Sequence, residues 1–274
     1  MKFEIYKYQG CGNDFVLIDN RSEEFPVDSD IVKWLCDRRF GVGADGLMLL
    51  ENDAEYDFKM RYFNCDGGEA SMCGNGGRCI VLFAHHLGIG SEHKLFMGID
   101  GLHQAQILEY DNSRAVVKLE MIDVDSVQSM GDDLFLDTGS PHYVHFCENP
   151  DNEDVVAYGR SVRYGEYFLQ RGGTNVNMVQ ILNENELFVR TYERGVEDET
   201  LACGTGVTAS AIAATVKTAS KENHWHVKTR GGLLTVDFER DSNGRFGNIR
   251  LTGSAVRVFA TEIDLNNYQH YKLN

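Results

Sequence analysis

The sequence contains one short motif twice, Cys73-Gly74-Asn75-Gly76 and Cys203-Gly204-Thr205-Gly206. Residues 58–76 align with residues 188–206 without a gap. The aligned stretches share these identical pairs: Phe58/Phe188, Tyr62/Tyr192, Glu69/Glu199, Cys73/Cys203, Gly74/Gly204 and Gly76/Gly206. At average composition, chance would produce about one identity over this length. A single repeat at so long a period predicts two domains of similar fold rather than a solenoid.

Each copy of the motif opens a predicted helix. The third residue of the motif, Asn75 or Thr205, is of a type that caps helix N-termini. Apolar residues then recur at helical spacing: Ile80, Phe83, Ala84 and Leu87 in the first copy, Ala209, Ile212, Ala213 and Val216 in the second. The second helix is alanine-rich on almost every side, which is typical of a helix buried all round. Each cysteine is therefore expected at or just before a helix N-terminus.

The N-terminus of a helix favours negative charge, because its first N–H groups have no intrahelical partner and the macrodipole is positive there. A cysteine in this position is favoured as a thiolate. If the two copies face each other across a cleft, one thiolate can take a proton from a carbon atom while the opposite thiol delivers another. Glycine-flanked amides would stabilise a carboxylate next to that carbon. The duplicated motif thus predicts inversion of a stereocentre beside a carboxylate.

Length and composition limit the remaining classes. The chain has 274 residues and a formal net charge of −16, which argues against a nucleic-acid or anionic-membrane surface. No charged and apolar leader precedes the first predicted strand, and no run approaches the roughly 20 apolar residues of a spanning helix. The seven scattered cysteines, without a leader, indicate reduced thiols in the cytoplasm. They lack zinc-site spacing, so no metal is expected.

The order of the predicted elements places the domain boundary near residues 121–128. An N-terminal domain would comprise residues 1–121 plus 258–274, and a C-terminal domain residues 122–257. Helix is predicted from the capping Asp28 to Arg39. The other expected elements are strands at residues 2–8, 15–18, 47–50, 56–62, 94–96, 104–109, 115–119, 187–192, 225–228, 233–238, 248–252 and 256–259, with helix or irregular structure at 155–168.

Further motifs surround the repeat. In the first half they are Gly12-Asn13-Asp14-Phe15, the loop Gly41-Val42-Gly43-Ala44-Asp45-Gly46, Phe63-Asn64-Cys65-Asp66-Gly67 and Met72-Cys73-Gly74-Asn75-Gly76. In the second half they are Pro141-His142, Thr174-Asn175, Tyr192-Glu193-Arg194-Gly195 and Ala202-Cys203-Gly204-Thr205-Gly206. Together, and in this order along nearly the whole chain, these motifs resemble those of the diaminopimelate epimerase family.

The resemblance implies an α+β fold of two pseudo-symmetric domains, each a β-barrel-like sheet around a central helix, with the active site in the cleft between them. It implies epimerisation of LL-2,6-diaminopimelate to the meso isomer, a step in lysine and peptidoglycan precursor synthesis, without pyridoxal phosphate or any other cofactor. The expected partner is this small-molecule substrate, with no nucleic acid and no membrane. A homodimer is compatible with the resemblance.

The resemblance also implies roles for individual residues. Cys73 and Cys203 would be the catalytic acid–base pair, with His142 and Glu193 tuning the two thiols, whose titration is coupled. Gly74, Asn75, Gly204 and Thr205 would hold the reacting carboxylate at the helix ends. The remaining substrate groups would be bound by Asn13, Asn64, Asn175, Glu193 and Arg194, of which the Arg194 guanidinium matches a distal carboxylate.

Several alternatives remain open at the level of sequence. Some family members carry Asn and Gln where this chain has Ser140 and Gly46, and both positions concern recognition of the distal groups. A racemase or epimerase for proline or hydroxyproline would also pair two cysteines, but a monocarboxylate gives no reason for Arg194. Phenazine-type isomerases lack the cysteine pair. A redox dithiol or a thiol peroxidase is a candidate from another class.

Ordinary structural roles are alternative explanations for several individual residues. Asn13 and Asn175 could be turn residues. His142 could be a hydrogen-bonded core histidine, and Arg194 could be a surface charge. The duplicated Glu69 and Glu199 are interpreted as loop or capping acids rather than catalysts.

Overall fold

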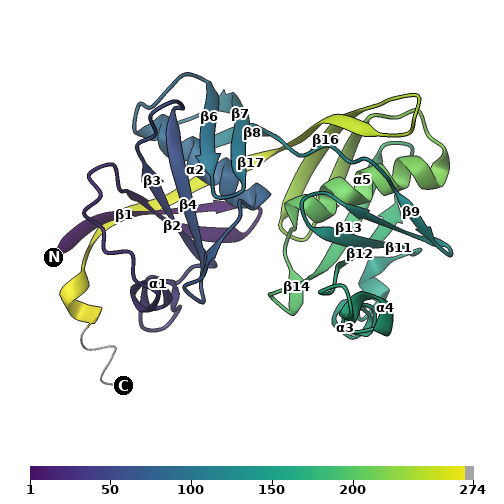
Figure 1. Ribbon diagram of the computed structural model, residues 1–274, viewed down its shortest axis with the longest axis horizontal. Coiled ribbons are helices and arrows are strands. Elements are labelled where there is room, and N and C mark those ends of the chain that lie inside the picture. The colour runs from purple at the N-terminus through teal and green to yellow at the C-terminus, as the bar shows by residue number, and fades with distance from the viewer. Residues whose placement is uncertain (269–274) are drawn as a thin grey trace. The chain divides into compact units, whose positions relative to one another are not determined.

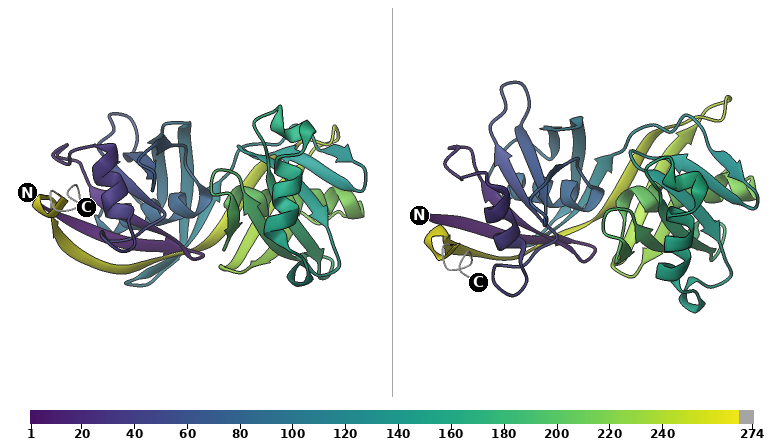
Figure 2. Two further views of the ribbon diagram at one scale, coloured as in Figure 1. Left: turned by 90° about the horizontal axis from the view of Figure 1, so that it is seen from below. Right: turned by 60° about the horizontal axis from the view of Figure 1, so that its bottom comes forward.

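The computed structural model describes residues 1–268, and its internal contacts divide the chain into two units (Figure 1). Unit 1 consists of residues 1–119 together with the described residues from 254 onward, and unit 2 of residues 120–253. Strand β17 (Phe246–Asp264) contributes to both units and is the yellow strand of Figures 1 and 2. The predicted epimerase domains remain a prediction, and residues 269–274 of the first lie outside the described residues.

Unit 1 is a ring of strands with one helix inside it. Its elements are β1 (Lys2–Gly10), β2 (Asn13–Asp19), α1 (Ser29–Cys36), β3 (Gly46–Glu51), β4 (Phe58–Asn64), β5 (Glu69–Ala70), α2 (Gly74–His86), β6 (His93–Gly98), β7 (Gly101–Tyr110), β8 (Arg114–Glu120) and the 3-10 turn η2 (Leu265–Asn267). The ladder runs β17–β1–β2–β3–β4–β6–β7–β8 and returns to β17, so the sheet closes. Helix α2 packs against β1, β2, β3 and β7.

Unit 2 repeats this plan. Its elements are β9 (Gln128–Met130), β10 (Asp133–Asp137), β11 (Pro141–Phe146), η1 (Pro150–Asn152), α3 (Val155–Arg163), α4 (Glu166–Leu169), β12 (Asn175–Ile181), β13 (Glu186–Glu193), β14 (Asp198–Thr200), α5 (Gly204–Thr218), β15 (His224–Thr229) and β16 (Gly232–Arg240). The ladder runs β9–β10–β11–β12–β13–β15–β16–β17. The segment that leads into β9 bridges back to β17 through Val124 and Phe246.

The order of parallel and antiparallel pairs confirms the duplication. In unit 1, β2 pairs with β3 and β4 with β6 in parallel, whereas their other neighbours are antiparallel. In unit 2 the corresponding parallel pairs are β11 with β12 and β13 with β15. The predicted pair of similar sheets, each around a central helix, is therefore correct. Both central helices are buried over most of their length. The alanine-rich sequence predicted this for α5, whereas for α2 the apolar spacing predicted only a helix.

Two details of the predicted strands are wrong. The strands predicted at 248–252 and 256–259 are one continuous strand, β17, because Gly253 and Ser254 stay extended and in the ladder. The short strands β5 and β14 were not predicted, because pairing with β4 and β13 decides their conformation rather than local propensity. Strands β9, β10, β11 and β12 were not assigned as strands either.

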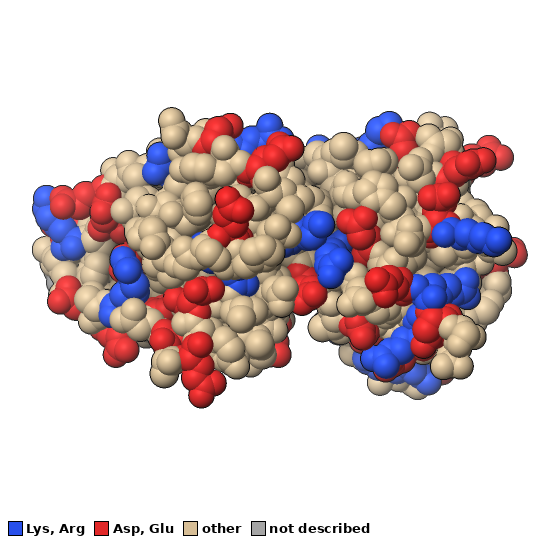
Figure 3. All heavy atoms as spheres, turned by 90° about the horizontal axis from the view of Figure 1, so that it is seen from above, with Lys and Arg blue, Asp and Glu red and all other residues tan. Residues whose placement is uncertain are grey.

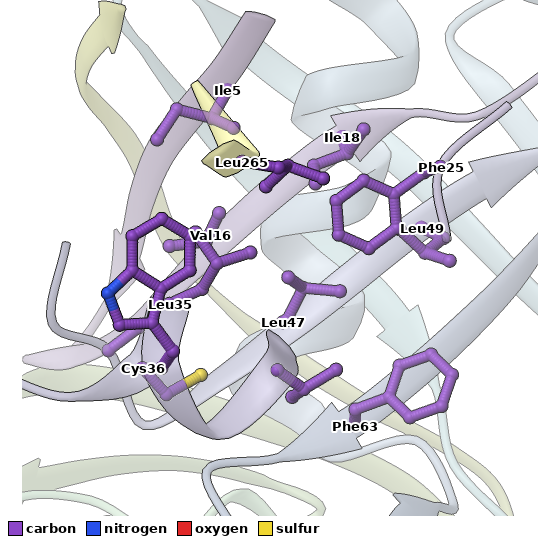
Figure 4. Close-up of a cluster of buried hydrophobic side chains, with 13 residues drawn as sticks. Ile5, Val16, Ile18, Phe25, Leu35, Cys36, Leu47, Leu49, Phe63 and Leu265 are labelled. Atoms are coloured by element: carbon purple, nitrogen blue, oxygen red, sulfur yellow. The ribbon is translucent and has the colours of Figure 1, made fainter. Parts of the chain in front are cut away.

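Helix α1 covers the outer face of the sheet in unit 1. It is capped by Asp28, whose carboxylate accepts from the N–H groups of Asp30 and Ile31. It ends earlier than predicted, at Cys36. A cluster of buried side chains joins α1 to the sheet (Figure 4), namely Ile5, Val16, Ile18, Phe25, Val32, Trp34, Leu35, Cys36, Ala44, Leu47, Leu49, Phe63 and Leu265. This packing supports the loop between α1 and β3, which carries Asp45.

The surface charge and the hydropathy of the helices in the described part of the chain agree with the composition. On the face shown in Figure 3, acidic side chains are interspersed with basic ones. Within residues 1–268, none of the helices combines the length and the apolar character needed to cross a membrane.

Candidate active site

Cys73 is the N-cap residue of α2. Its backbone is extended (φ −102°, ψ 148°), and its Sγ accepts a hydrogen bond from the N–H of Gly76 at 3.3 Å. Cys203 takes the same place before α5, with φ −112° and ψ 115°. The sequence had indicated Asn75 and Thr205 as capping residues. That was wrong, because the helices begin at Gly74 and Gly204 and the cysteines themselves adopt the extended cap conformation.

In unit 1, two asparagines lie next to Cys73. The Oδ1 atom of Asn13 lies 3.8 Å from the Cys73 sulfur and 3.4 Å from the Nδ2 atom of Asn75. The orientation of the Asn13 amide follows from its other end, where Nδ2 donates to the Asp45 carboxylate at 2.6 Å. Because a carboxylate only accepts, the Asn13 oxygen must face Cys73 and Asn75.

Arg78 supports this pair from inside the unit. Its side chain is fully buried, and it donates to the Oδ1 of Asn75 at 2.8 Å and to the carbonyl of Gly74 at 3.0 Å. A third bond reaches the carbonyl of Ser254 at 3.3 Å. Arg78 therefore fixes which end of the Asn75 amide points toward Asn13.

An ion-pair network holds the loop that carries Asn13. The Asp14 carboxylate contacts Lys7 at 2.7 Å and Arg38 at 2.7 Å, and Arg38 also donates to Asp45 at 2.7 Å. Burial alone would raise the pKa of Asp14, but hydrogen bonds from Arg38 and Lys7 outweigh it and lower the pKa to about 2. The charged form of Asp14 thus stabilises the folded state.

This network predicts a specific acid sensitivity. Because the pKa of Asp14 is lower in the folded than in the unfolded chain, its contribution is complete above pH ~4 and is lost as the pH falls toward about 2. Asp14→Asn should remove that part of the pH dependence and lower the free energy of unfolding at pH 7 by about 1 kcal/mol, since Arg38 is largely exposed and screened. Urea unfolding at several pH values measures this. The exposed Asp125→Asn serves as the control, and an unchanged acid profile in Asp14→Asn would contradict the assignment.

Asn64 lies at the end of β4, opposite Gly46 of β3. Asn64 is exposed, whereas Asn13 is half-buried and Asn75 is buried beside Cys73. Gly46 itself packs closely against Tyr62 and the carbonyl of Phe63, so a larger residue there would displace the strand. The structure explains the glycine at this position by packing.

In unit 2, a chain of hydrogen-bonding groups leads to Cys203. The Cys203 sulfur lies 3.4 Å from the Thr205 hydroxyl, and Nε2 of His142 lies 2.9 Å from the same hydroxyl. His142 is fully buried, and burial together with the charge of Arg194 lowers its pKa to about 3, against a smaller opposing effect of Asn177. At neutral pH His142 is therefore uncharged.

Asn175 connects three neighbouring segments. Its Nδ2 donates to the hydroxyl of Ser140 at 2.8 Å and to the carbonyl of Pro141 at 3.1 Å. Its Oδ1 accepts from the backbone N–H of Arg194 at 2.8 Å. The serine that distinguishes this chain thus orients Asn175, and Asn175 fixes the backbone at Arg194.

The acidic residues at the end of β13 and in the turn after it form hydrogen bonds and ion pairs. Glu193 accepts from the Thr200 hydroxyl at 2.9 Å, and Glu197 pairs with Arg163 at 2.6 Å, which helps to lower the pKa of Glu197 to about 2. The duplicated Glu69 and Glu199 lie on short strands, not in loops, and each pairs with an arginine of the neighbouring strand. In the described part of the chain, no three or more His, Cys, Asp or Glu side chains are grouped to hold a metal ion.

Comparison with known proteins decides the family. The sequence matches the family model described as diaminopimelate epimerase over residues 5–121 and 134–258. The protein named diaminopimelate epimerase from Flavobacterium psychrophilum is 48% identical over 261 residues, covering 95% of this chain and 100% of that protein. Its namesake from Aquifex aeolicus is 43% identical over 276 residues, covering 93% and 96%. The chain belongs to the diaminopimelate epimerase family.

Two solved structures are similar in fold to this diaminopimelate epimerase family member. A phenazine biosynthesis protein of the PhzF family from Bacillus anthracis aligns with a TM-score of 0.74 at 15% identity, covering 96% of this chain and 99% of the other. A hydroxyproline epimerase from Agrobacterium vitis aligns with a TM-score of 0.69 at 13% identity, covering 97% and 94%. These similarities concern the fold alone and confirm the predicted fold class. Family membership confirms the predicted isomerase class.

Sequence reasoning missed three residues of the site in this diaminopimelate epimerase family member. Arg78 had a usable signal, because a lone cation within an apolar helical pattern must find buried partners. Asn177 follows Asn175 by two positions, so both face the same side of β12. Thr191 is the cross-strand partner of Asn177, which only the observed register reveals.

Proposed function

We propose that this protein converts LL-2,6-diaminopimelate to the meso isomer, using Cys73 and Cys203 as an acid–base pair. The observation that carries the proposal is the equivalent position of the two cysteines, each at the N-cap of the central helix of its own unit. Family membership supplies the substrate class. The mechanism requires both sulfurs to reach one α-carbon, one from each unit.

In this mechanism one thiolate removes the α-proton and the opposite thiol donates a proton to the other face. Negative charge develops on the adjacent carboxylate. The backbone amides at the two helix starts, Gly74 with Asn75 and Gly204 with Thr205, are suited to stabilise this charge, because N–H groups in the first turn of a helix do not take part in its intrahelical hydrogen bonds. Loss of one such donor typically costs about 3 kcal/mol of transition-state stabilisation.

Recognition of the substrate would use the remaining polar groups. Asn13 and Asn64 of unit 1, with Asn175, Glu193 and Arg194 of unit 2, would bind the amino groups and the distal carboxylate. The Arg194 guanidinium suits the distal carboxylate because it can donate two parallel hydrogen bonds. The backbone N–H of Arg194 donates to Asn175 at 2.8 Å, and Nη1 of its guanidinium lies 3.4 Å from the carbonyl of Gly172. His142 and Glu193 would tune the thiols.

The proposal includes the cellular setting. A reduced cysteine pair fits a cytoplasmic enzyme, and a homodimer is the proposed assembly. No cofactor is part of the mechanism, because the two thiols with the helix-end amides provide the base, the acid and the charge stabilisation that α-proton exchange needs.

Proton NMR in D₂O tests the function. Purified protein with a thiol reductant and a chelator, but no pyridoxal phosphate, is incubated with LL-diaminopimelate. We expect loss of one α-proton signal and appearance of the meso isomer, because the donated proton comes from solvent-exchanged thiol. L-Proline and hydroxyproline under the same conditions should remain unchanged, since a monocarboxylate does not use Arg194. Turnover of proline in place of diaminopimelate would refute the substrate assignment.

A further inference from the structure

Asn177 is held in one orientation by partners on two neighbouring strands. Its Oδ1 accepts from the hydroxyl of Thr191, its partner across the β12–β13 ladder, at 2.9 Å. Its Nδ2 donates to the backbone carbonyl of Tyr143 at 3.2 Å. A carbonyl only accepts, so the amino end of Asn177 must point that way. Asn177 and Thr191 are buried, so Oδ1 and Nδ2 of Asn177 and the Thr191 hydroxyl are shielded from solvent.

The orientation of Asn177 determines where His142 carries its proton. The same Nδ2 of Asn177 lies 3.1 Å from Nδ1 of His142. Because Asn177 presents an N–H there, Nδ1 must be the unprotonated acceptor, and the proton of the neutral ring lies on Nε2. Nε2 then donates to the Thr205 hydroxyl at 2.9 Å. Asn175 is also 3.4 Å from Nε2, but its amino group already donates to Ser140 and Pro141.

The direction of donation in this series of hydrogen bonds extends to the Cys203 sulfur. Thr205 has a single hydroxyl proton, and its oxygen is occupied by the N–H of His142. The proton is therefore available to the sulfur at 3.4 Å. A donor to sulfur stabilises the thiolate over the thiol. With the opposite tautomer, Nε2 would accept the Thr205 proton and the sulfur would lose the Thr205 donor.

We propose that Asn177 is a positioning residue that fixes the Nε2–H tautomer of His142 and thereby directs the Thr205 hydroxyl toward Cys203. Thr191 holds the Asn177 amide in the orientation that this role requires. The catalytic consequence rests on the proposed role of Cys203, but the tautomer does not. Gly206 is part of the same arrangement, since a side chain there would collide with the Asn177 oxygen and approach the His142 ring.

The tautomer can be measured without any turnover. Long-range ¹H–¹⁵N correlation spectra distinguish a protonated from an unprotonated ring nitrogen, and His142→Gln identifies the His142 signals by their absence. We expect wild-type protein at pH 7 to show neutral His142 protonated at Nε2 only. The isosteric Asn177→Asp replaces the donor by an acceptor and should move a proton onto Nδ1. A wild-type spectrum with Nδ1 protonated would overturn the proposal, even if no variant folds.

The effect on Cys203 is tested by its titration. Protein labelled with ¹³C at the cysteine β-carbon reports thiol and thiolate directly, and Cys203→Ala assigns the signal. Asn177→Asp, Asn177→Leu and Thr191→Val should each raise the Cys203 midpoint by about one pH unit, or tenfold less thiolate, as expected for one lost hydrogen bond to a charged group. Thr218→Val, at the far end of α5, is the matched control and should leave the midpoint unchanged. Equal Cys203 titration midpoints in the wild type and all variants would overturn the proposed effect of Asn177 on Cys203.

Discussion

Replacing either Cys73 or Cys203 with alanine should reduce epimerisation by about a thousandfold or more. Each thiol would supply a proton transfer that typically contributes 10²- to 10⁴-fold, and neither can serve both faces of the α-carbon. The fold should survive, because an N-cap side chain contributes only about 1 kcal/mol and the helices behind both cysteines are buried in their units. Conversion of LL- to meso-diaminopimelate is measured by NMR, and folding by thermal unfolding.

The two variants should also behave differently from variants that only lose substrate binding. The remaining cysteine can still take an α-proton from its own face and return a deuteron to that face. Exchange of the α-proton without inversion is therefore expected for one stereoisomer in each variant. Cys147→Ala is a matched control, since burial raises the pKa of this thiol and it lies outside the proposed site. Full inversion by either the Cys73 or the Cys203 variant would contradict the two-base mechanism.

The response of the wild-type protein to reductant and oxidant separates epimerisation from redox chemistry. In a redox dithiol, each cysteine would require the other for a disulfide, and activity would depend on an added oxidant or peroxide. An acid–base pair instead needs both sulfurs reduced. Wild-type protein should therefore be fully active with excess reductant, and oxidation should inactivate it. A redox role leaves the pairing of two glycine-rich helix starts and the presence of Arg194 unexplained, which is why the acid–base pair is preferred.

The architecture was largely predictable because local signals and tertiary contacts agree. The apolar spacing after Cys73 and Cys203 predicted both central helices, and Asp28 predicted the start of α1. The errors fall where tertiary pairing decides. Continuous pairing carries β17 through Gly253, and the cap position shifted to the cysteines because Gly74 and Gly204 already adopt helical conformation.

The candidate site was predictable only for residues that carry distinctive chemistry. A paired cysteine motif stands out in a sequence, whereas the function of Asn177 depends on facing Thr191 and His142, which lie on other strands. Ser140 was noted as a departure, but its bond to Asn175 follows from the parallel register of β11 and β12. Hydrogen-bond polarity arises from three-dimensional neighbours, so it has no counterpart in spacing or composition.

Arg78→Met should destabilise the protein by about 3 kcal/mol and also lower activity. Arg78 is buried, and its removal takes one donor away from Asn75 Oδ1 and one from the Ser254 carbonyl in the interior of the unit. Each buried polar group left unsatisfied costs about 1–3 kcal/mol. Activity should fall because Arg78 no longer holds Asn75 Oδ1, which weakens the orientation that presents the Asn75 amino group to Asn13. Urea unfolding and NMR turnover measure the two effects.

The control for Arg78→Met is Arg39→Met, which removes an equally long cation from an exposed position. Arg78→Lys gives a finer test. A lysine retains the positive charge but cannot reproduce the planar fork that contacts Gly74, Asn75 and Ser254 together. It should recover part of the stability but less of the activity, because orientation of Asn75 depends on the fork rather than on charge. If Arg78→Lys matched wild type in both measurements, charge alone would explain the buried arginine, and the amide orientation would not depend on it.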